Sequence, residues 1–285
     1  ILNNPLGVTG VLHQPVAYST TAPLPGGQQT FQVSGGLLLP LGITAQQIKG
    51  VILYFHGTTF SKDQVGSSYA NPETQLNAQV FASQGYVVLM PDYVGQGIDW
   101  QNVHPYVLYP KVSAQAAVDM LAAVKPILLD QYQMTGQETL NLFSAGYSEG
   151  GSYSLWFNTY LSENPSLADP FYRLTHSVGM EGAYSTSKVI YGYLFEDVSK
   201  DGSNPYNVQT QLLVNLVKPI LSADAFLSYA TYSLDSDFAS VFNPEFFAMK
   251  ATLPVEQSKC DVNGQQADIA SAFALPSTQI ATELL

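Results

Sequence analysis

The sequence predicts an α/β fold with a mostly parallel sheet, and three observations carry that prediction. Short apolar runs such as Val51-Ile52-Leu53-Tyr54-Phe55 and Tyr86-Val87-Val88-Leu89-Met90 are typical of buried strands. Helical stretches lie between such runs, and this alternation is typical of parallel sheets with crossover helices on both faces. The chain has 285 residues, 46% of them apolar and 11% charged. It can therefore bury a substantial core, in one large domain or two small ones.

Charge and cysteine content exclude several classes of function. The formal net charge is −12, and Arg173 is the single arginine among ten basic residues. Nucleic acids and anionic membranes need clustered lysine and arginine, so neither is an expected partner. Cys260 is the only cysteine, which excludes an intrachain disulfide and a cysteine-rich zinc site. The apolar strand runs are about five residues long, well short of the roughly 20 of a membrane span.

The first 60 residues are expected to form a sheet edge with turns. Residues 8–18 and 29–39 alternate between apolar and polar side chains, and the turn signal Pro25-Gly26-Gly27 lies between them. This segment contains Lys49 and no carboxylate. We expect the two runs to pair as antiparallel strands.

Strands and helices then alternate to about residue 184. A helical stretch near 72–84 separates the two apolar runs. A longer helix is expected over 113–131, with Ser113 as its N-cap and Pro126 as a site of kinking or shortening. Its apolar residues recur at spacings of three and four and define one buried face: Ala117, Met120, Leu121, Val124, Ile127 and Leu128.

The second half of the pattern predicts two further strands and a change of architecture. Strands are expected at 139–144 and 174–180, with a helix over 152–161 between them. Beyond about residue 184 the alternation stops, and the remaining sequence has helical character broken by prolines. The expected organisation is a core over residues 1–184 and a helical cap or lid over residues 185–285.

The motif that carries chemistry is Gly146-Tyr147-Ser148-Glu149-Gly150, which follows an apolar strand and precedes a helix. In this G-x-S-x-G pattern, Gly146 and Gly150 permit a tight strand-to-helix turn on which a serine stands exposed. The adjacent helix N-terminus favours a developing oxyanion. An ordinary serine in a glycine-rich turn is the alternative, but the strand–turn–helix context favours Ser148 as a nucleophile, with Tyr147 in a supporting role.

A second element, His56-Gly57-Thr58-Thr59, follows the strand at 51–55 directly. An oxyanion hole takes one amide from the residue after the nucleophile and one from the loop after this earlier strand. The N–H groups of Glu149 and Thr58 fit these positions. His56 is a candidate general base, but a role in supporting the loop together with Gly57 is the stronger interpretation.

Together these segments resemble a known family. Besides the strand ending in His-Gly-Thr and the serine motif, the resemblance rests on Gly85 to Tyr93 with Gly95 and Gly97, on His104-Pro105-Tyr106, and on the helix that follows. The set looks like an α/β-hydrolase and is most similar to the secretory lipases of the lipase-A type, which have a helical cap inserted after the sixth strand. The resemblance covers about residues 30–185. It implies hydrolysis of esters or lipids by a Ser, Asp, His triad in chain order.

The histidines do not fit that implication. The chain has His13, His56, His104 and His176, and none follows residue 176. In this fold the acid and base follow the nucleophile on later loops. We therefore expect the triad Asp and His, and the last strands of the sheet, on a segment absent from this sequence or on a companion chain. A hydrolase-like binding module that has lost its base and a site using Glu181 as the acid are alternatives.

The expected substrate is a small ester or a lipid. Aromatic residues are abundant over 186–250; most would hold the cap together, and some would favour acyl chains over charged groups. A peptidase of the same fold is the enzymatic alternative. No cofactor or metal is expected, since residues 261–268 lack the ligand set of a calcium loop. The low charge and the absence of an initiating methionine predict a secreted or periplasmic protein.

Overall fold

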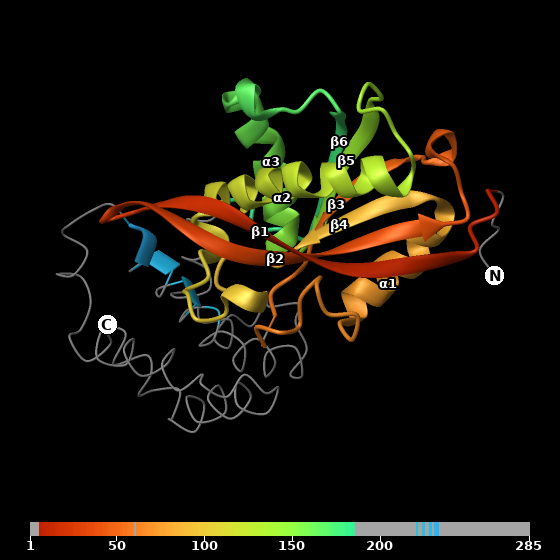
Figure 1. Cartoon of the computed structure of the whole chain (residues 1–285). Coiled ribbons are helices and arrows are strands. Elements are labelled where there is room, and N and C mark those ends of the chain that lie inside the picture. The colour runs from red at the N-terminus through yellow and green to blue at the C-terminus, as the bar shows by residue number, and fades with distance from the viewer. Residues whose placement is uncertain are drawn as a thin grey trace, which may run out of the picture.

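A computed structural model describes residues 6–59 and 61–185 and eight positions between 221 and 233. One six-stranded sheet organises these residues, with the strands in the order β1-β2-β4-β3-β5-β6 (Figure 1). The sheet is mixed but mostly parallel and is flanked by helices, so the predicted fold class is confirmed. The bounds of its strands are β1 Gly10–Leu24, β2 Gly27–Leu41, β3 Gly50–Phe55, β4 Tyr86–Pro91, β5 Leu140–Tyr147 and β6 Tyr172–Met180.

β1 and β2 form the predicted antiparallel hairpin. Leu24 lies opposite Gly27, so the connection is the two residues Pro25 and Gly26. Gly27 has a φ of 112°, which glycine adopts without strain. Each strand has 15 residues and extends beyond the predicted range. β1 lies at one edge of the sheet, as expected, and β2 pairs antiparallel with β4.

The other three pairings, of β4 with β3, β3 with β5 and β5 with β6, are all parallel. Every residue of β3 is buried, because helices cover both faces of the sheet. Leu53 and Phe55 contribute to the larger apolar core, whereas Ile52 and Tyr54 contribute to a smaller one on the opposite face. The alternation follows from the period of two along a strand.

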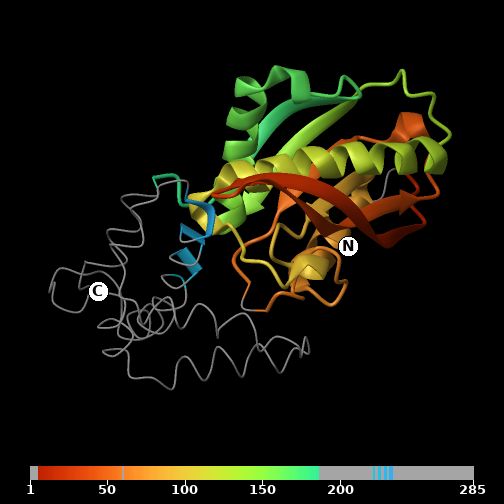
Figure 2. The ribbon, with the colours of Figure 1, turned by 60° about the vertical axis from the view of Figure 1, so that its left-hand side comes forward.

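Helices cover both faces, as the crossover pattern predicts. α1 (Pro72–Val80) covers the smaller core, and α2 (Pro110–Gln131) and α3 (Glu149–Glu163) cover the larger one. Figure 1 shows α1 below the sheet and α2 and α3 above it. The turned view in Figure 2 shows α2 running along the hairpin of β1 and β2.

The predicted start of the long helix is wrong. α2 begins at Pro110 rather than after Ser113, and Ser113 is a fully buried residue inside the first turns. Proline favours the first helical position because its φ is fixed and its missing N–H is not needed there. The helix continues past Pro126 to Gln131. By length and composition α2 could cross a membrane, and it is the one such helix in the described part of the chain, but half of its apolar window is buried in this fold.

Only part of the predicted cap can be compared with the structure. Within residues 185–285, the structure describes residue 185 and eight positions from 221 to 233, and seven of those eight are helical. The division into a core and a cap stays a prediction. The other cap residues lie outside the described part of the chain, and so does Cys260.

A buried carboxylate connects the hairpin to the loops that follow β4. Asp92 is fully buried; its Oδ2 accepts from the Ser34 hydroxyl at 2.6 Å and its Oδ1 from the Ser67 N–H at 2.8 Å. Ser34 Oγ in turn accepts the Ile98 N–H at 3.1 Å. Burial raises the pKa of Asp92, and these hydrogen bonds and the neighbouring His56 act against that rise. Ser34 and Asp92 together thus join three segments: the hairpin, residues 92–98 and the loop that carries Ser67.

We predict that Ser34→Ala lowers the free energy of unfolding by about 1–3 kcal/mol, because it leaves one oxygen of Asp92 and the Ile98 N–H without partners in a buried site. Urea denaturation measures this change. Ser19→Ala on the same hairpin is the control, since the Ser19 hydroxyl makes an exposed contact with Gln32, and its effect should stay within about 0.5 kcal/mol. Equal losses in the two variants would contradict the bridging role of Ser34.

Candidate active site

Ser148 occupies a strained turn at the carboxyl edge of the sheet. β5 ends at Tyr147, α3 begins at Glu149, and Ser148 between them has φ 55° and ψ −118°. A residue with a side chain adopts this conformation only under constraint, at a cost of order 1–3 kcal/mol. The Ser148 N–H donates to the Met180 carbonyl at 2.8 Å, and its side chain is half-buried. The turn therefore presents the serine at the end of β5.

Glycines allow the backbone segments around this turn to touch. A Cβ on Gly150 would run into the carbonyl groups of Phe55 and His56, and a Cβ on Gly146 would meet the carbonyl of Gly150. Gly151 lies equally close to Met180. Any side chain at these positions would push α3 away from β3 and β6, so the glycines hold the start of the helix against the sheet.

The loop after β3 lies beside the serine turn. A Cβ on Gly57 would be 3.4 Å from Tyr147, and the Gly57 N–H donates to the Glu73 carboxylate at 3.2 and 3.4 Å. None of the described residues accepts the N–H of Thr58. The N–H of Glu149, at the first position of α3, lacks an intrahelical acceptor because of where it lies in the helix. The structure thus brings the loop that carries Thr58 next to the turn that carries Ser148 and Glu149.

His56 packs beneath this loop. Its ring is fully buried, its Nδ1 donates to the Gly57 carbonyl at 2.8 Å, and it stacks on Tyr93 with centroids 4.2 Å apart. The Tyr93 hydroxyl donates to the His56 carbonyl at 2.9 Å. His56 Nε2 has no hydrogen-bond partner among the described residues. These contacts favour loop support over general-base catalysis.

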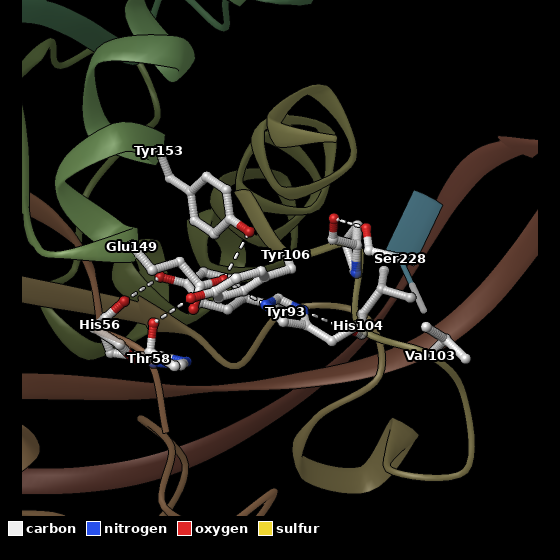
Figure 3. A network of polar contacts seen from close by, with 12 residues as sticks. His56, Thr58, Tyr93, Val103, His104, Tyr106, Glu149, Tyr153 and Ser228 are labelled. Atoms are coloured by element: carbon white, nitrogen blue, oxygen red, sulfur yellow. Dashed lines mark hydrogen bonds and ion pairs between the residues drawn. The ribbon is translucent and has the colours of Figure 1, made fainter. Parts of the chain in front are cut away.

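His104 contacts the side chain of Glu149, the residue directly after Ser148. His104 Nε2 forms an ion pair with Oε1 of Glu149, and His104 Nδ1 donates to the Val94 carbonyl at 3.0 Å (Figure 3). The same Glu149 oxygen accepts from the Tyr153 hydroxyl at 2.7 Å. The Glu149 side chain is almost fully buried. Glu149 therefore combines the candidate oxyanion amide at the start of α3 with a buried charge.

Two opposing effects set the pKa of the Glu149 carboxyl. Burial acts to raise it, but the charge of His104 and the hydrogen bonds from His104 and Tyr153 outweigh burial, so the pKa lies below its usual value. A buried ion pair of this kind is strongly destabilising to break, by about 3–5 kcal/mol, when one partner alone is removed. From the sequence, Glu149 was assigned a role only through its backbone N–H. The available signal for its side chain was an acidic residue inside an apolar strand–turn–helix motif, because a carboxylate buried there needs a partner.

The turn that carries His104 also contacts the helical positions near residue 230. The Ser228 hydroxyl donates to the Pro105 carbonyl, and the Tyr232 hydroxyl donates to the Val103 carbonyl at 2.6 Å. On its other side the Tyr106 hydroxyl lies 3.2 Å from the Thr58 hydroxyl, as Figure 3 shows. Residues 103–106 thus lie between the loop after β3, the start of α3 and this helix.

The other histidines are far from Ser148. His176 pairs with Phe143, whereas Met180 pairs with Tyr147 at the carboxyl edge. Four residues of strand separate His176 from that edge, or about 13 Å. His13 lies on β1, with Nε2 3.0 Å from the Gly66 carbonyl.

Two further predictions concern Glu181 as an alternative acid and the possibility of a metal site. Glu181, the alternative acid, follows β6 as an exposed residue with φ 52°. Within the described residues no group of three or more His, Cys, Asp or Glu side chains could hold a metal ion. The contacts of the four histidines, given above, leave no general base for Ser148 among the described histidines.

We predict that Ser148→Gly is more stable than Ser148→Ala by about 1–3 kcal/mol, because glycine adopts the positive φ without strain. Chemical denaturation of both variants measures the difference. Asn158, an exposed residue inside α3, is the control position, and there alanine should be more stable than glycine by about 1 kcal/mol. If alanine were more stable than glycine at position 148 as well as at position 158, Ser148 would be unstrained.

Comparison with known proteins shows which solved structures share this fold. No family model and no curated protein matches the sequence. Among solved structures, a hydrolase-like protein from Legionella pneumophila is 22% identical with a TM-score of 0.64, over 98% of this chain and 72% of that one. The rice cell wall degrading esterase LipA from Xanthomonas oryzae is 21% identical with a TM-score of 0.65, over 96% of this chain and 65% of that one.

Lipase A from Candida antarctica is also similar, at 12% identity and a TM-score of 0.52, over 87% of this chain and 52% of that one. This chain therefore spans about half to three quarters of the length of these structures. At such low identity the likeness concerns the fold. The chain has the α/β-hydrolase fold, in the form found in these lipase-A-like structures.

Proposed function

We propose that this chain is the nucleophile-bearing part of a serine hydrolase that cleaves carboxylic esters or lipids. The observation that carries the proposal is the strained backbone of Ser148 beside two amides without internal acceptors. Strain of this kind is retained where it serves a function. The esterase and lipase with the same fold add support from analogy of fold alone.

The reaction would proceed through an acyl-enzyme. Ser148 Oγ attacks the ester carbonyl carbon while a base takes its proton, and the carbonyl oxygen becomes an oxyanion that the Thr58 and Glu149 amides stabilise. The carbon–oxygen bond to the alcohol breaks, and the alcohol leaves with the proton from the base. Water then attacks the acyl carbon, releases the carboxylic acid and returns the proton to Ser148.

The base and its acid partner would come from a segment outside these 285 residues. All four histidines lie in the described part of the chain, and none is placed to serve Ser148. β6 pairs with β5 on one side, and no described strand pairs with its other side. Val178 and Met180 on β6 are 52% and 41% exposed. Further strands added at this edge would cover them and bring loops to the carboxyl edge near Ser148.

Apolar surface near Ser148 favours an uncharged substrate. Tyr147 is the last residue of β5, and Tyr184 lies in the segment that follows β6; they are 49% and 52% exposed. The net charge of −12 disfavours carboxylate- or phosphate-bearing ligands. We place the protein outside the cytoplasm, with residues 185–285 as a cap over the site, as the sequence predicts.

A hydrolase-like binding module remains the second candidate, and the absence of a histidine after residue 176 favours it. Loss of a triad base costs about 10⁶-fold in turnover, so a chain without one would be practically inactive. The two candidates differ in whether Ser148 reacts.

We predict that a fluorophosphonate probe labels Ser148 in the protein isolated together with any polypeptide that accompanies it. Peptide mass spectrometry locates the adduct. Ser148→Ala should abolish labelling and lower ester turnover by about 10⁶-fold. Ser162→Ala at the exposed end of α3 is the control and should leave labelling unchanged. Labelling that survives Ser148→Ala, or none in the native protein, would overturn the proposed nucleophile.

We also predict that nitrophenyl esters are cleaved in preference to aminoacyl amides, because apolar surface near the serine suits an acyl chain. Values of kcat/KM for esters of increasing chain length and for aminoacyl nitroanilides make the comparison. Faster cleavage of the amides would indicate a peptidase of the same fold.

A further inference from the structure

Both ring nitrogens of His104 face hydrogen-bond acceptors. Nδ1 lies 3.0 Å from the Val94 carbonyl oxygen, and Nε2 lies against the Glu149 carboxylate. A neutral imidazole donates from one nitrogen only, so two donated hydrogen bonds require the imidazolium form. The lowered pKa of Glu149 keeps its carboxyl ionised and able to accept. The geometry therefore describes a buried cation and anion.

The anion of this pair belongs to the residue whose amide faces the candidate oxyanion hole. Oε1 of Glu149 is contacted both by His104 and by Tyr153, one turn along α3. His104 is itself anchored to the Val94 carbonyl, and its ring lies parallel to that of Tyr93 with centroids 5.4 Å apart. Rotation of the Glu149 peptide about Ser148 would pull the carboxylate out of these contacts.

We propose that His104 is a positioning residue which, as an imidazolium, holds Glu149 so that its N–H stays aimed at the oxyanion. The inference rests on the proposed function. His104 does not touch the substrate; it acts through Glu149. An oxyanion hole stabilises the transition state only when its donors are fixed in advance, so loss of the pair should lower kcat while leaving KM nearly unchanged.

The groups around the pair set the electrostatic surroundings of His104 and Glu149. Burial raises the pKa of Tyr93 and of Tyr153 well above 10, so both stay neutral at neutral pH. Burial also raises the pKa of Asp224, the carboxyl on the helix near residue 230, to about 6. The titratable groups that face the pair from the surrounding segments are His56, Tyr93, Tyr106, Tyr153 and Asp224.

The charge state can be measured without turnover. In protein with ¹⁵N-labelled histidine, NMR should show both nitrogens of His104 protonated at neutral pH. The Glu149 amide proton should exchange with solvent at least tenfold faster in His104→Asn than in the native protein. His176→Asn, which changes an exposed histidine on β6, is the control and should leave the Glu149 amide unaffected.

Kinetics test the catalytic consequence. Because His104→Asn alone leaves a buried carboxylate unpaired and can fail to fold, the double variant His104→Asn, Glu149→Gln removes both charges. It should lower kcat for a nitrophenyl ester by about 10- to 100-fold, with KM within about twofold. Unchanged kcat, or a neutral His104 in the native protein, would overturn the positioning role. If the native protein neither hydrolyses esters nor labels at Ser148, the proposed function fails, and the NMR measurements alone decide whether His104 holds the Glu149 amide.

Discussion

The left-handed backbone of Ser148 is the constraint on which the rest of the site depends. A serine adopts φ 55° only if the residues around it leave no alternative. Three glycines provide that constraint, because their missing side chains let α3 begin in contact with the carbonyl groups at the ends of β3 and β6. The same contacts place the first amide of α3 next to the loop after β3. One crowded junction of backbone thus forms the turn of the candidate nucleophile and both candidate oxyanion donors.

The fold could be predicted largely from local pattern. Short β-branched runs marked β3 and β4, and the Pro25-Gly26 turn marked the hairpin, because period and turn chemistry are local properties. The start of α2 was mispredicted because Ser113 and Pro110 are both favourable near a helix start, and only packing distinguishes them. Tertiary contacts decided that Ser113 is buried inside the helix rather than capping it.

The candidate site was predictable only in part. Ser148 and the Thr58 loop follow from motif and context, since their roles depend on backbone geometry. The partnership of His104 with Glu149 joins residues 45 positions apart, and no local signal reports such a pairing. The turn at residues 103–106 likewise acquires its importance from neighbours in three separate segments. The buried charge pair is therefore the part of this site that could be found only from the structure.

One side of β6 pairs with no described strand, and this has a consequence for handling the protein. A strand whose N–H and C=O groups find no partner invites pairing with another molecule, and Val178 and Met180 make this edge apolar as well. Within the described part of the chain, Arg173 is the charged residue on β6, and it lies at the opposite end of the strand. On the proposed function, in which further strands pair with this edge, a polypeptide without those strands should self-associate through β6, and producing them with it should raise its solubility.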